Sequence, residues 1–206
     1  MSALMKAGQW AGAVGAVALM WAASSEPLVD IYLPWEWTRG TDGAQFDVPL
    51  RDHPEHRHAA EVKVAGFQKI EPGDFPEITP PEGFDMWAVL TEWSAAPEAV
   101  LKDCQMWAIG DDDVTYPLAP WALALDDLSQ PCVPPGEEGP YLEWDINLDI
   151  SDPNAMVLME GNPRPEAWKK ISVIVAPAGV TPQELRFGWE EPRFMTLTLP
   201  EPKPFV

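Results

Sequence analysis

The sequence lacks the short motifs by which common enzyme classes are recognised. Its 206 residues contain no GxSxG, no P-loop, no HExxH and no GxGxxG. Histidine occurs only three times, always between residues 53 and 58, so a Ser-His-Asp triad would need this one segment to reach a distant serine. Paired carboxylates point to no reaction either, because 33 acidic residues always supply some pair. We therefore expect neither an enzyme nor a cofactor.

Basic residues are also scarce. The chain has 13 Lys and Arg against 33 Asp and Glu, which gives a net charge of −20. Such a field repels nucleic acid and anionic lipid headgroups, so we expect neither as a partner. The remaining interpretations are solubility, which we favour, and docking to a basic surface.

Cysteine is limited to Cys104 and Cys132. An even pair in a translocated domain normally forms one disulfide. No CxxC and no Cys/His ligand set accompanies the pair, so a zinc site is not expected. The bond would stabilise the fold by about 3–4 kcal/mol in the chain-entropy model.

The sequence does contain a charge-free stretch, residues 7–25. As a helix it would be about 28 Å long, close to the ~30 Å hydrocarbon core of a bilayer. Gly8, Gly12 and Gly15 fall on one stripe, which allows a second helix to approach closely. Trp35 and Trp37 follow, as in an interfacial collar. Residues 1–37 are therefore predicted to be a single membrane anchor that packs against another membrane protein.

Two alternatives to the retained span stay open. One is a cleaved signal peptide, with Lys6 as the charged region, residues 14–20 as the apolar region and residues 22–24 as the cleavage site. The other is a buried helix of a soluble protein. The cysteine pair favours an N-terminus on the inner side of the cell membrane and a C-terminal domain on its extracytoplasmic side.

Residues 38–60 are predicted to be a polar stem. This segment holds His53, His56 and His58. Imidazole suits Zn²⁺ and Cu²⁺, but Pro54 interrupts the run and the spacing matches no rigid ligand template. The three histidines are therefore only weak metal candidates, and we expect a solvated linker.

Residues 61–200 have the pattern of an all-β domain. The 24 prolines of the whole chain argue against a helical body. Strands are predicted at 61–70 (with a bulge near Gly66), 85–94, 100–109, 114–118, 141–150, 171–176, 184–187 and 194–199. A short helix is predicted at 121–128, a loop at 151–170 and a tail at 201–206. Such strands indicate a β-sandwich.

Several stretches follow a known order: "FDMWAVLTEW", a strand with Cys104, "QPCVPPG", "ISVIVAPAGVTPQELRFGW" and a final "LTLP". This order resembles the immunoglobulin-like (telokin-like) extracytoplasmic domains of actinobacterial secreted antigens, lipoproteins and membrane-anchored proteins. The resemblance spans residues 61–200 and implies a disulfide between Cys104 and Cys132. The chain departs from the group in its long 139–170 insertion and in lacking a lipidated cysteine.

The expected function is that of a non-catalytic, single-pass accessory or assembly subunit of a larger membrane complex. Its helix would contact integral membrane subunits, and its sandwich would contact an extracytoplasmic protein surface. Accessory subunits of actinobacterial cytochrome bcc–aa3 respiratory supercomplexes are of similar build. The alternatives are a metal-binding or small-molecule-binding module of the cell envelope and a secreted antigen-like domain. The candidate contact residues are Trp35, Trp37, Met156, Val157, Leu158 and Met159.

Overall fold

The computed structural model describes residues 35–41, 43–50, 53–71, 80–118, 130–144, 156–189 and 193–205. The strands are β1 (Trp35–Gly40), β2 (Gly43–Pro49), β3 (Arg57–Ile70), β4 (Phe84–Ser94), β5 (Gln105–Gly110), β6 (Thr115–Pro117), β7 (Tyr141–Trp144), β8 (Met156–Met159), β9 (Ala167–Pro177), β10 (Pro182–Gly188) and β11 (Arg193–Thr198). Within these ranges there is no helix of the length and apolarity needed to cross a membrane. The predicted span, with Gly8, Gly12 and Gly15, and the predicted helix at 121–128 lie outside the described residues.

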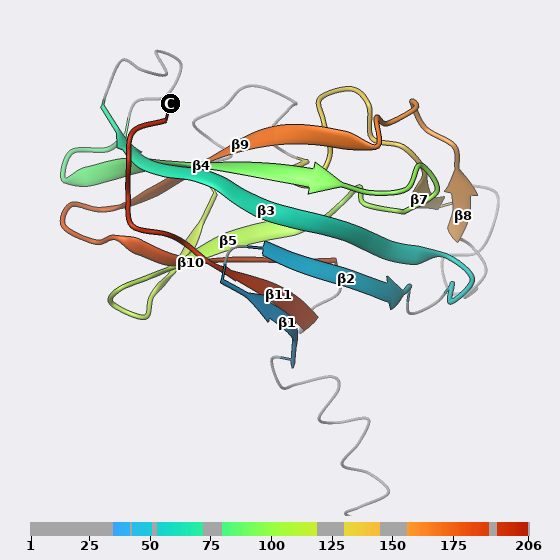
Figure 1. Ribbon diagram of the computed structural model, residues 1–206, viewed down its shortest axis with the longest axis horizontal. Coiled ribbons are helices and arrows are strands. Elements are labelled where there is room, and N and C mark those ends of the chain that lie inside the picture. The colour runs from blue at the N-terminus through green and yellow to red at the C-terminus, as the bar shows by residue number, and fades with distance from the viewer. Residues whose placement is uncertain are drawn as a thin grey trace, which may run out of the picture.

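The strands form two main sheets, as the sequence predicts for a β-sandwich (Figure 1). One sheet has the order β1-β11-β10-β5-β6, and the other has the order β2-β3-β4-β9. Strand β1 runs parallel to β11, whereas the other neighbours are antiparallel. Strands β7 and β8 form a separate two-stranded sheet at one end of the molecule.

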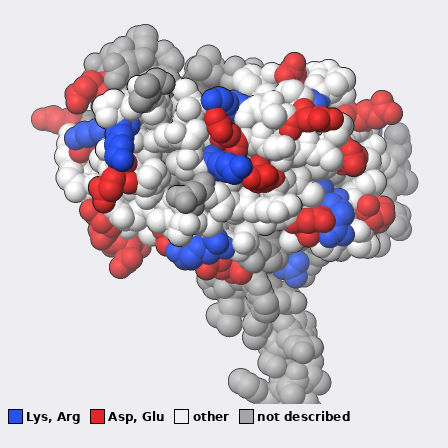
Figure 2. All heavy atoms as spheres, in the orientation of Figure 1, with Lys and Arg blue, Asp and Glu red and all other residues white. Residues whose placement is uncertain are grey.

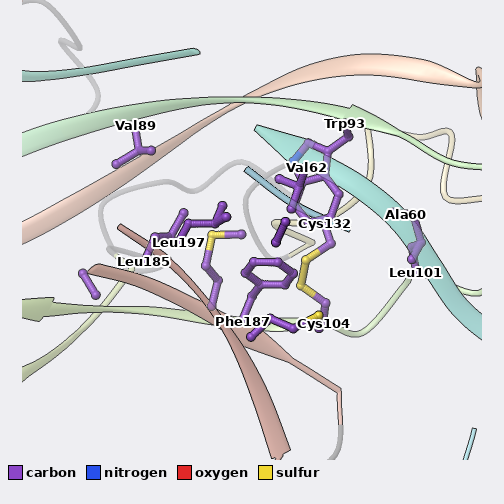
Figure 3. Close-up of a cluster of buried hydrophobic side chains, with 14 of the residues drawn as sticks. Ala60, Val62, Val89, Trp93, Leu101, Cys104, Cys132, Leu185, Phe187 and Leu197 are labelled. Carbon is purple, nitrogen blue, oxygen red and sulfur yellow. A yellow bond between two sulfur atoms is a disulfide. The ribbon is translucent and has the colours of Figure 1, made fainter. Parts of the chain in front are cut away.

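The core lies between the two main sheets. Strand β4 is central in its sheet, paired with β3 and β9, as its aromatic and apolar sequence predicts. The Phe187 ring meets Trp93 edge to face, with ring centroids 5.4 Å apart. Figure 3 shows these two rings beside the Cys104–Cys132 disulfide, with Leu185 and Leu197 further along the core. Burial of these large side chains supplies most of the driving force for folding.

The predicted bulge in β3 is confirmed. The pairing between β3 and β4 shifts register between Val64 and Gly66. Before the shift the even positions Ala60 and Val62 face the main core, and after it the odd position Phe67 does so. One extra residue in a strand changes which side chains face inward, so the bulge lets both halves of β3 bury apolar residues.

The prediction of a polar stem at residues 38–60 is wrong, and so is the predicted boundary of the collar at residue 37. Trp35 and Trp37 belong to β1, and residues 43–49 and 57–60 form β2 and the start of β3. The alternation Ala44, Phe46 places two buried side chains in the core, although the segment is polar on average. A half-buried strand needs only every second residue to be apolar. The sandwich therefore begins at least 25 residues earlier than predicted, at residue 35 rather than 61.

Three other boundaries differ from the prediction. The strand predicted at 100–109 starts only at Gln105, and the chain turns just before it, where Asp103 has a φ of 64°. The predicted loop 151–170 contains β8 and the start of β9. The predicted tail lies on the four-stranded sheet, where Lys203 N–H donates to Phe67 O at 2.8 Å.

Charges of both signs are mixed on the surface. Figure 2 shows basic side chains next to acidic ones on one face of the molecule. Ion pairs link neighbouring strands of the four-stranded sheet: Lys169 Nζ lies 2.7 Å from Glu92 Oε1, and Lys69 Nζ lies 2.8 Å from Asp85 Oδ2. Exposed pairs of this kind contribute at most about 1 kcal/mol each. Their main consequence is a well-solvated surface.

Candidate functional site: a cavity beside the β7–β8 hairpin

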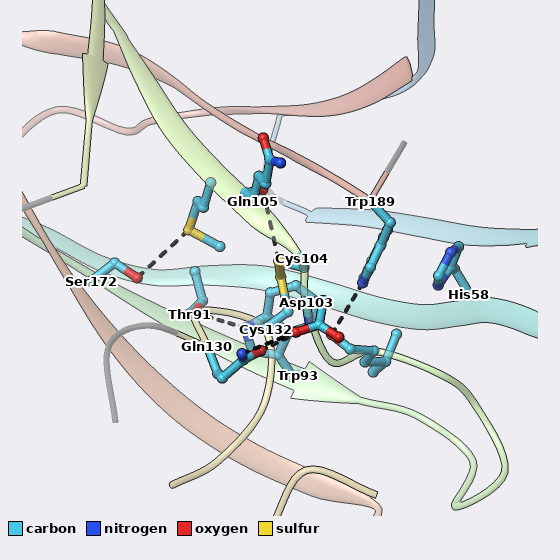
Figure 4. The surroundings of a disulfide bond; sticks show 12 residues. His58, Thr91, Trp93, Asp103, Cys104, Gln105, Gln130, Cys132, Ser172 and Trp189 are labelled. Carbon is cyan, nitrogen blue, oxygen red and sulfur yellow. Dashed lines mark hydrogen bonds between the residues drawn. A yellow bond between two sulfur atoms is a disulfide. The ribbon is translucent and has the colours of Figure 1, made fainter. Parts of the chain in front are cut away.

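The predicted disulfide is present and fixes one wall of the site. Cys104 and Cys132 are bonded, with their Cα atoms 6.0 Å apart. Next to the disulfide, Gln130 makes two hydrogen bonds: its Oε1 accepts from Asp103 N–H at 2.8 Å, and its Nε2 donates to Asp103 Oδ1 at 3.2 Å (Figure 4). The loop that precedes β5 is thereby tied to residues 130–132.

Two aromatic side chains hold the other side of this loop. His58 Nδ1 lies 2.7 Å from Val100 O, and because a carbonyl oxygen only accepts, the proton is on Nδ1. Trp189 Nε1 donates to Leu101 O at 3.1 Å. The two rings are stacked, with centroids 4.3 Å apart and planes 10° apart, as Figure 4 shows. The carbonyl groups of two consecutive loop residues, Val100 and Leu101, are therefore both hydrogen-bonded by this pair of rings.

A cavity of about 230 Å³ adjoins this arrangement. Its apolar walls are Leu50, Val100, Leu142 and Met156, together with the Trp189 ring, and its polar lining residues are His53, His58, Lys102 and Asp103. Leu142 comes from β7 and Met156 from β8. The hairpin thus closes the cavity against the end of the sandwich.

Most polar groups around the cavity already have partners. Lys102 Nζ lies 3.5 Å from the centre of the Tyr141 ring and 3.7 Å from Glu138 Oε1. Asp103 is bound to Gln130. His53 differs, because its Nε2 is buried and has no hydrogen-bond partner among the described residues. The cavity therefore combines an apolar, aromatic surface with one unsatisfied polar nitrogen.

The histidine run is split between two environments, so the prediction of one solvated linker is wrong for His58. Its side chain is 4% exposed, and burial lowers the pKa of the imidazole to about 4, an effect that the bond to Val100 O only partly offsets. His53 and His56 lie in the turn before β3. In the described ranges, no three His, Cys, Asp or Glu side chains are grouped so that they would hold a metal ion.

Strand β8 exposes the apolar residues that the sequence singled out. Val157, Leu158 and Met159 are 37%, 40% and 39% exposed, whereas Met156 is half-buried at the cavity. Within the described part of the chain, β8 pairs only with β7. The structure therefore places the cavity and an exposed apolar strand on the same hairpin.

Several residues of the site were not predicted from the sequence. Leu142 was assigned to a strand without a role, Trp189 lay between two predicted strands, and Leu50 was in the predicted stem. A signal did exist for His58, because it precedes Ala60 and Val62 at intervals of two and so continues their inward-facing alternation. The convergence of distant segments on one cavity has no such local signal.

Comparison of the sequence with protein-family models and with curated proteins, and of the fold with solved structures, gave no match.

Proposed function

We propose that this chain is a non-catalytic accessory subunit. Its N-terminal segment anchors it at the outer face of a cell membrane. Its sandwich binds an extracytoplasmic surface of another subunit through β8. The anchor is proposed from the apolar residues 7–25, and the outer location is supported by the Cys104–Cys132 disulfide, because such bonds persist in oxidising compartments.

The observation that carries this proposal is the exposure of Val157, Leu158 and Met159 in one short strand. Because successive side chains of a strand point to opposite faces, these residues give both faces of β8 exposed apolar side chains, and grouped exposed apolar residues often mark a contact site. Methionine is also enriched in interface cores. The unpaired edge of β8, within the described residues, offers backbone groups to which a partner strand can add.

We further propose that the sandwich is immunoglobulin-like. Its neighbouring strands β3-β4-β9 correspond to the A-B-E order of immunoglobulin domains, and β5-β10-β11 correspond to C-F-G. Strand β6 beside β5 takes the place of C′. This order supports the resemblance to actinobacterial extracytoplasmic domains. On that resemblance alone, the partner that we propose is an actinobacterial respiratory supercomplex.

The test is co-purification from solubilised membranes with the full chain as bait. Leu158→Asp places a charge in the proposed contact and should lower the yield of co-purified integral membrane proteins at least about tenfold. Ile171→Asp is the matched control, because Ile171 is 37% exposed in β9, which belongs to the four-stranded sheet and not to the sheet of β7 and β8. It should leave the yield unchanged.

Two results would contradict the proposal. Equal yields with wild-type and Leu158→Asp would exclude β8 as the contact. Recovery of the chain as a soluble species without residues 1–25 would instead support a cleaved signal peptide. Both variants should unfold at the wild-type temperature, because exposed substitutions usually change stability by less than about 0.5 kcal/mol.

A further inference from the structure

The cavity beside the hairpin has a size that restricts what it can hold. Its volume is about 230 Å³. Pockets for drug-sized ligands usually start near ~300 Å³, whereas an apolar cavity of ~150 Å³ is known to bind benzene. A single ring system, larger than benzene and smaller than a typical drug, matches this volume.

The walls favour an aromatic ring. Leu50, Leu142 and Met156 supply aliphatic surface, and a thioether sulfur makes favourable contacts with aromatic rings. The stacked His58 and Trp189 rings add an aromatic wall, and one nitrogen of each ring already has a partner: His58 Nδ1 bonds to Val100 O, and Trp189 Nε1 bonds to Leu101 O. Such a wall offers π-contacts to an aromatic occupant.

His53 determines the polar character of the occupant. Glu55 Oε1 lies 3.4 Å from His53 Nδ1, and since a carboxylate only accepts, this contact favours a proton on Nδ1. Nε2 is then an acceptor, and it is buried without a hydrogen-bond partner among the described residues. An unsatisfied buried acceptor is costly, so an occupant that supplies an N–H or O–H donor gains over one that does not.

Other occupants fit less well. A metal ion would need several ligands, but no three metal-binding side chains are grouped in the described ranges. An anion would need a free cation, whereas the Lys102 ammonium already faces both the Tyr141 ring and the Glu138 carboxylate. The aromatic and aliphatic walls also give an anion little to bind.

We propose that this cavity binds one aromatic ring that carries an N–H or O–H donor, with the donor directed to His53 Nε2. The ring has two sources with the same chemistry: a free small aromatic molecule, or a Trp or Tyr side chain of a bound protein. The site does not depend on the β8 contact, because it is formed within this chain alone.

The test uses the full chain with ¹³C-methyl methionine, which reports on Met156 directly, and two ring compounds of the same shape. Indole has an N–H donor and benzofuran lacks one. Indole should shift the Met156 methyl signal saturably, and benzofuran should bind about tenfold more weakly, the loss expected for one unmade buried hydrogen bond. The Met156 signal is identified from its loss in Met156→Leu.

Variants assign the donor contact. His53→Leu should remove the difference between indole and benzofuran, whereas His56→Leu, a neighbouring histidine outside the cavity lining, should preserve it. Adding N-acetyl-tryptophan amide separates the two sources. Tighter binding than indole indicates a protein side chain, and weaker binding indicates a free small molecule.

The proposal is overturned if indole does not shift Met156 saturably, or if indole and benzofuran bind wild-type protein equally. Both measurements use unmutated protein, so misfolding of a variant does not affect them. Neither depends on co-purification with membrane proteins, and failure here is therefore distinct from failure of the proposed β8 contact.

Discussion

His58 links the fold to pH, because it is buried in its neutral form. Its pKa is about 4 in the folded chain and near the ordinary 6.5 in the unfolded chain. Between these values the unfolded chain binds a proton that the folded chain does not, so stability is full above pH 6.5 and declines as the pH falls to 4. The loss from this one group is on the order of 3 kcal/mol.

We therefore predict that the urea concentration at the midpoint of unfolding decreases when the pH is lowered from 7 to 4.5. His58→Gln should remove most of this decrease. Glutamine retains a donor for Val100 O but does not titrate. The variant should be somewhat less stable than wild type at pH 7, because the stacking on Trp189 is lost. An unchanged pH dependence in His58→Gln would show that another group is responsible.

Buried polar residues are the part of the fold that sequence reasoning missed most at this scale. Arg164 lies in a predicted loop, yet it is 5% exposed, and its Nη2 donates to Ala96 O at 2.8 Å and Ala99 O at 3.1 Å. Burial lowers the pKa of its guanidinium from the ordinary value. An arginine in a polar segment looks solvated in the sequence, because the carbonyl groups that bind it belong to a loop about 65 residues earlier.

At the scale of elements, the C-terminal segment behaves as part of the sheet that it crosses. Phe205 N–H donates to Gln68 Oε1 at 2.7 Å, and the Phe205 ring packs on a second apolar cluster on the outer face of the four-stranded sheet: Ile70, Met86, Ala88, Val173 and Val175. A Cβ atom at Gly66 would lie 2.7 Å from the Phe205 ring. A side chain at this position of the bulge would therefore displace the Phe205 ring.

This contact predicts coupling between Gly66 and Phe205. Phe205→Ala should lower the free energy of unfolding by about 1–2 kcal/mol, because the ring is only partly buried. Gly66→Ala should destabilise wild type by displacing the ring but should cost little in Phe205→Ala. Denaturant unfolding of the four proteins should give a coupling energy of about 1 kcal/mol. Additive single effects would show that Phe205 does not rest on Gly66.

Strands with a strong alternating or aromatic pattern were predicted well, whereas the short strands β1 and β8 were not. Strand β4 and the bulge in β3 follow from local sequence, because the side chains that face inward are apolar. Strand β1 and strand β8 were missed or read as loops, since a short strand is defined by the strand it pairs with. The pairing of two strands leaves no mark on the local pattern of either strand.

At the scale of the whole molecule, the sandwich and its disulfide were predictable because composition and cysteine count restrict both. Many prolines and short strands indicate two packed sheets, and a single cysteine pair leaves one intramolecular bond. The cavity was not predictable, because residues 50–58, residues 100–103 and Trp189 have to meet beside the β7–β8 hairpin. The proposed activities both lie at that end of the molecule.

The most direct test of the central claim places a photo-crosslinking amino acid at position 158 of the full chain in intact cells. Our account predicts a discrete adduct with one membrane-complex subunit from position 158, and no such adduct from position 171, which is similarly exposed on β9. The absence of any adduct at position 158, or the same adducts from both positions, would contradict the account.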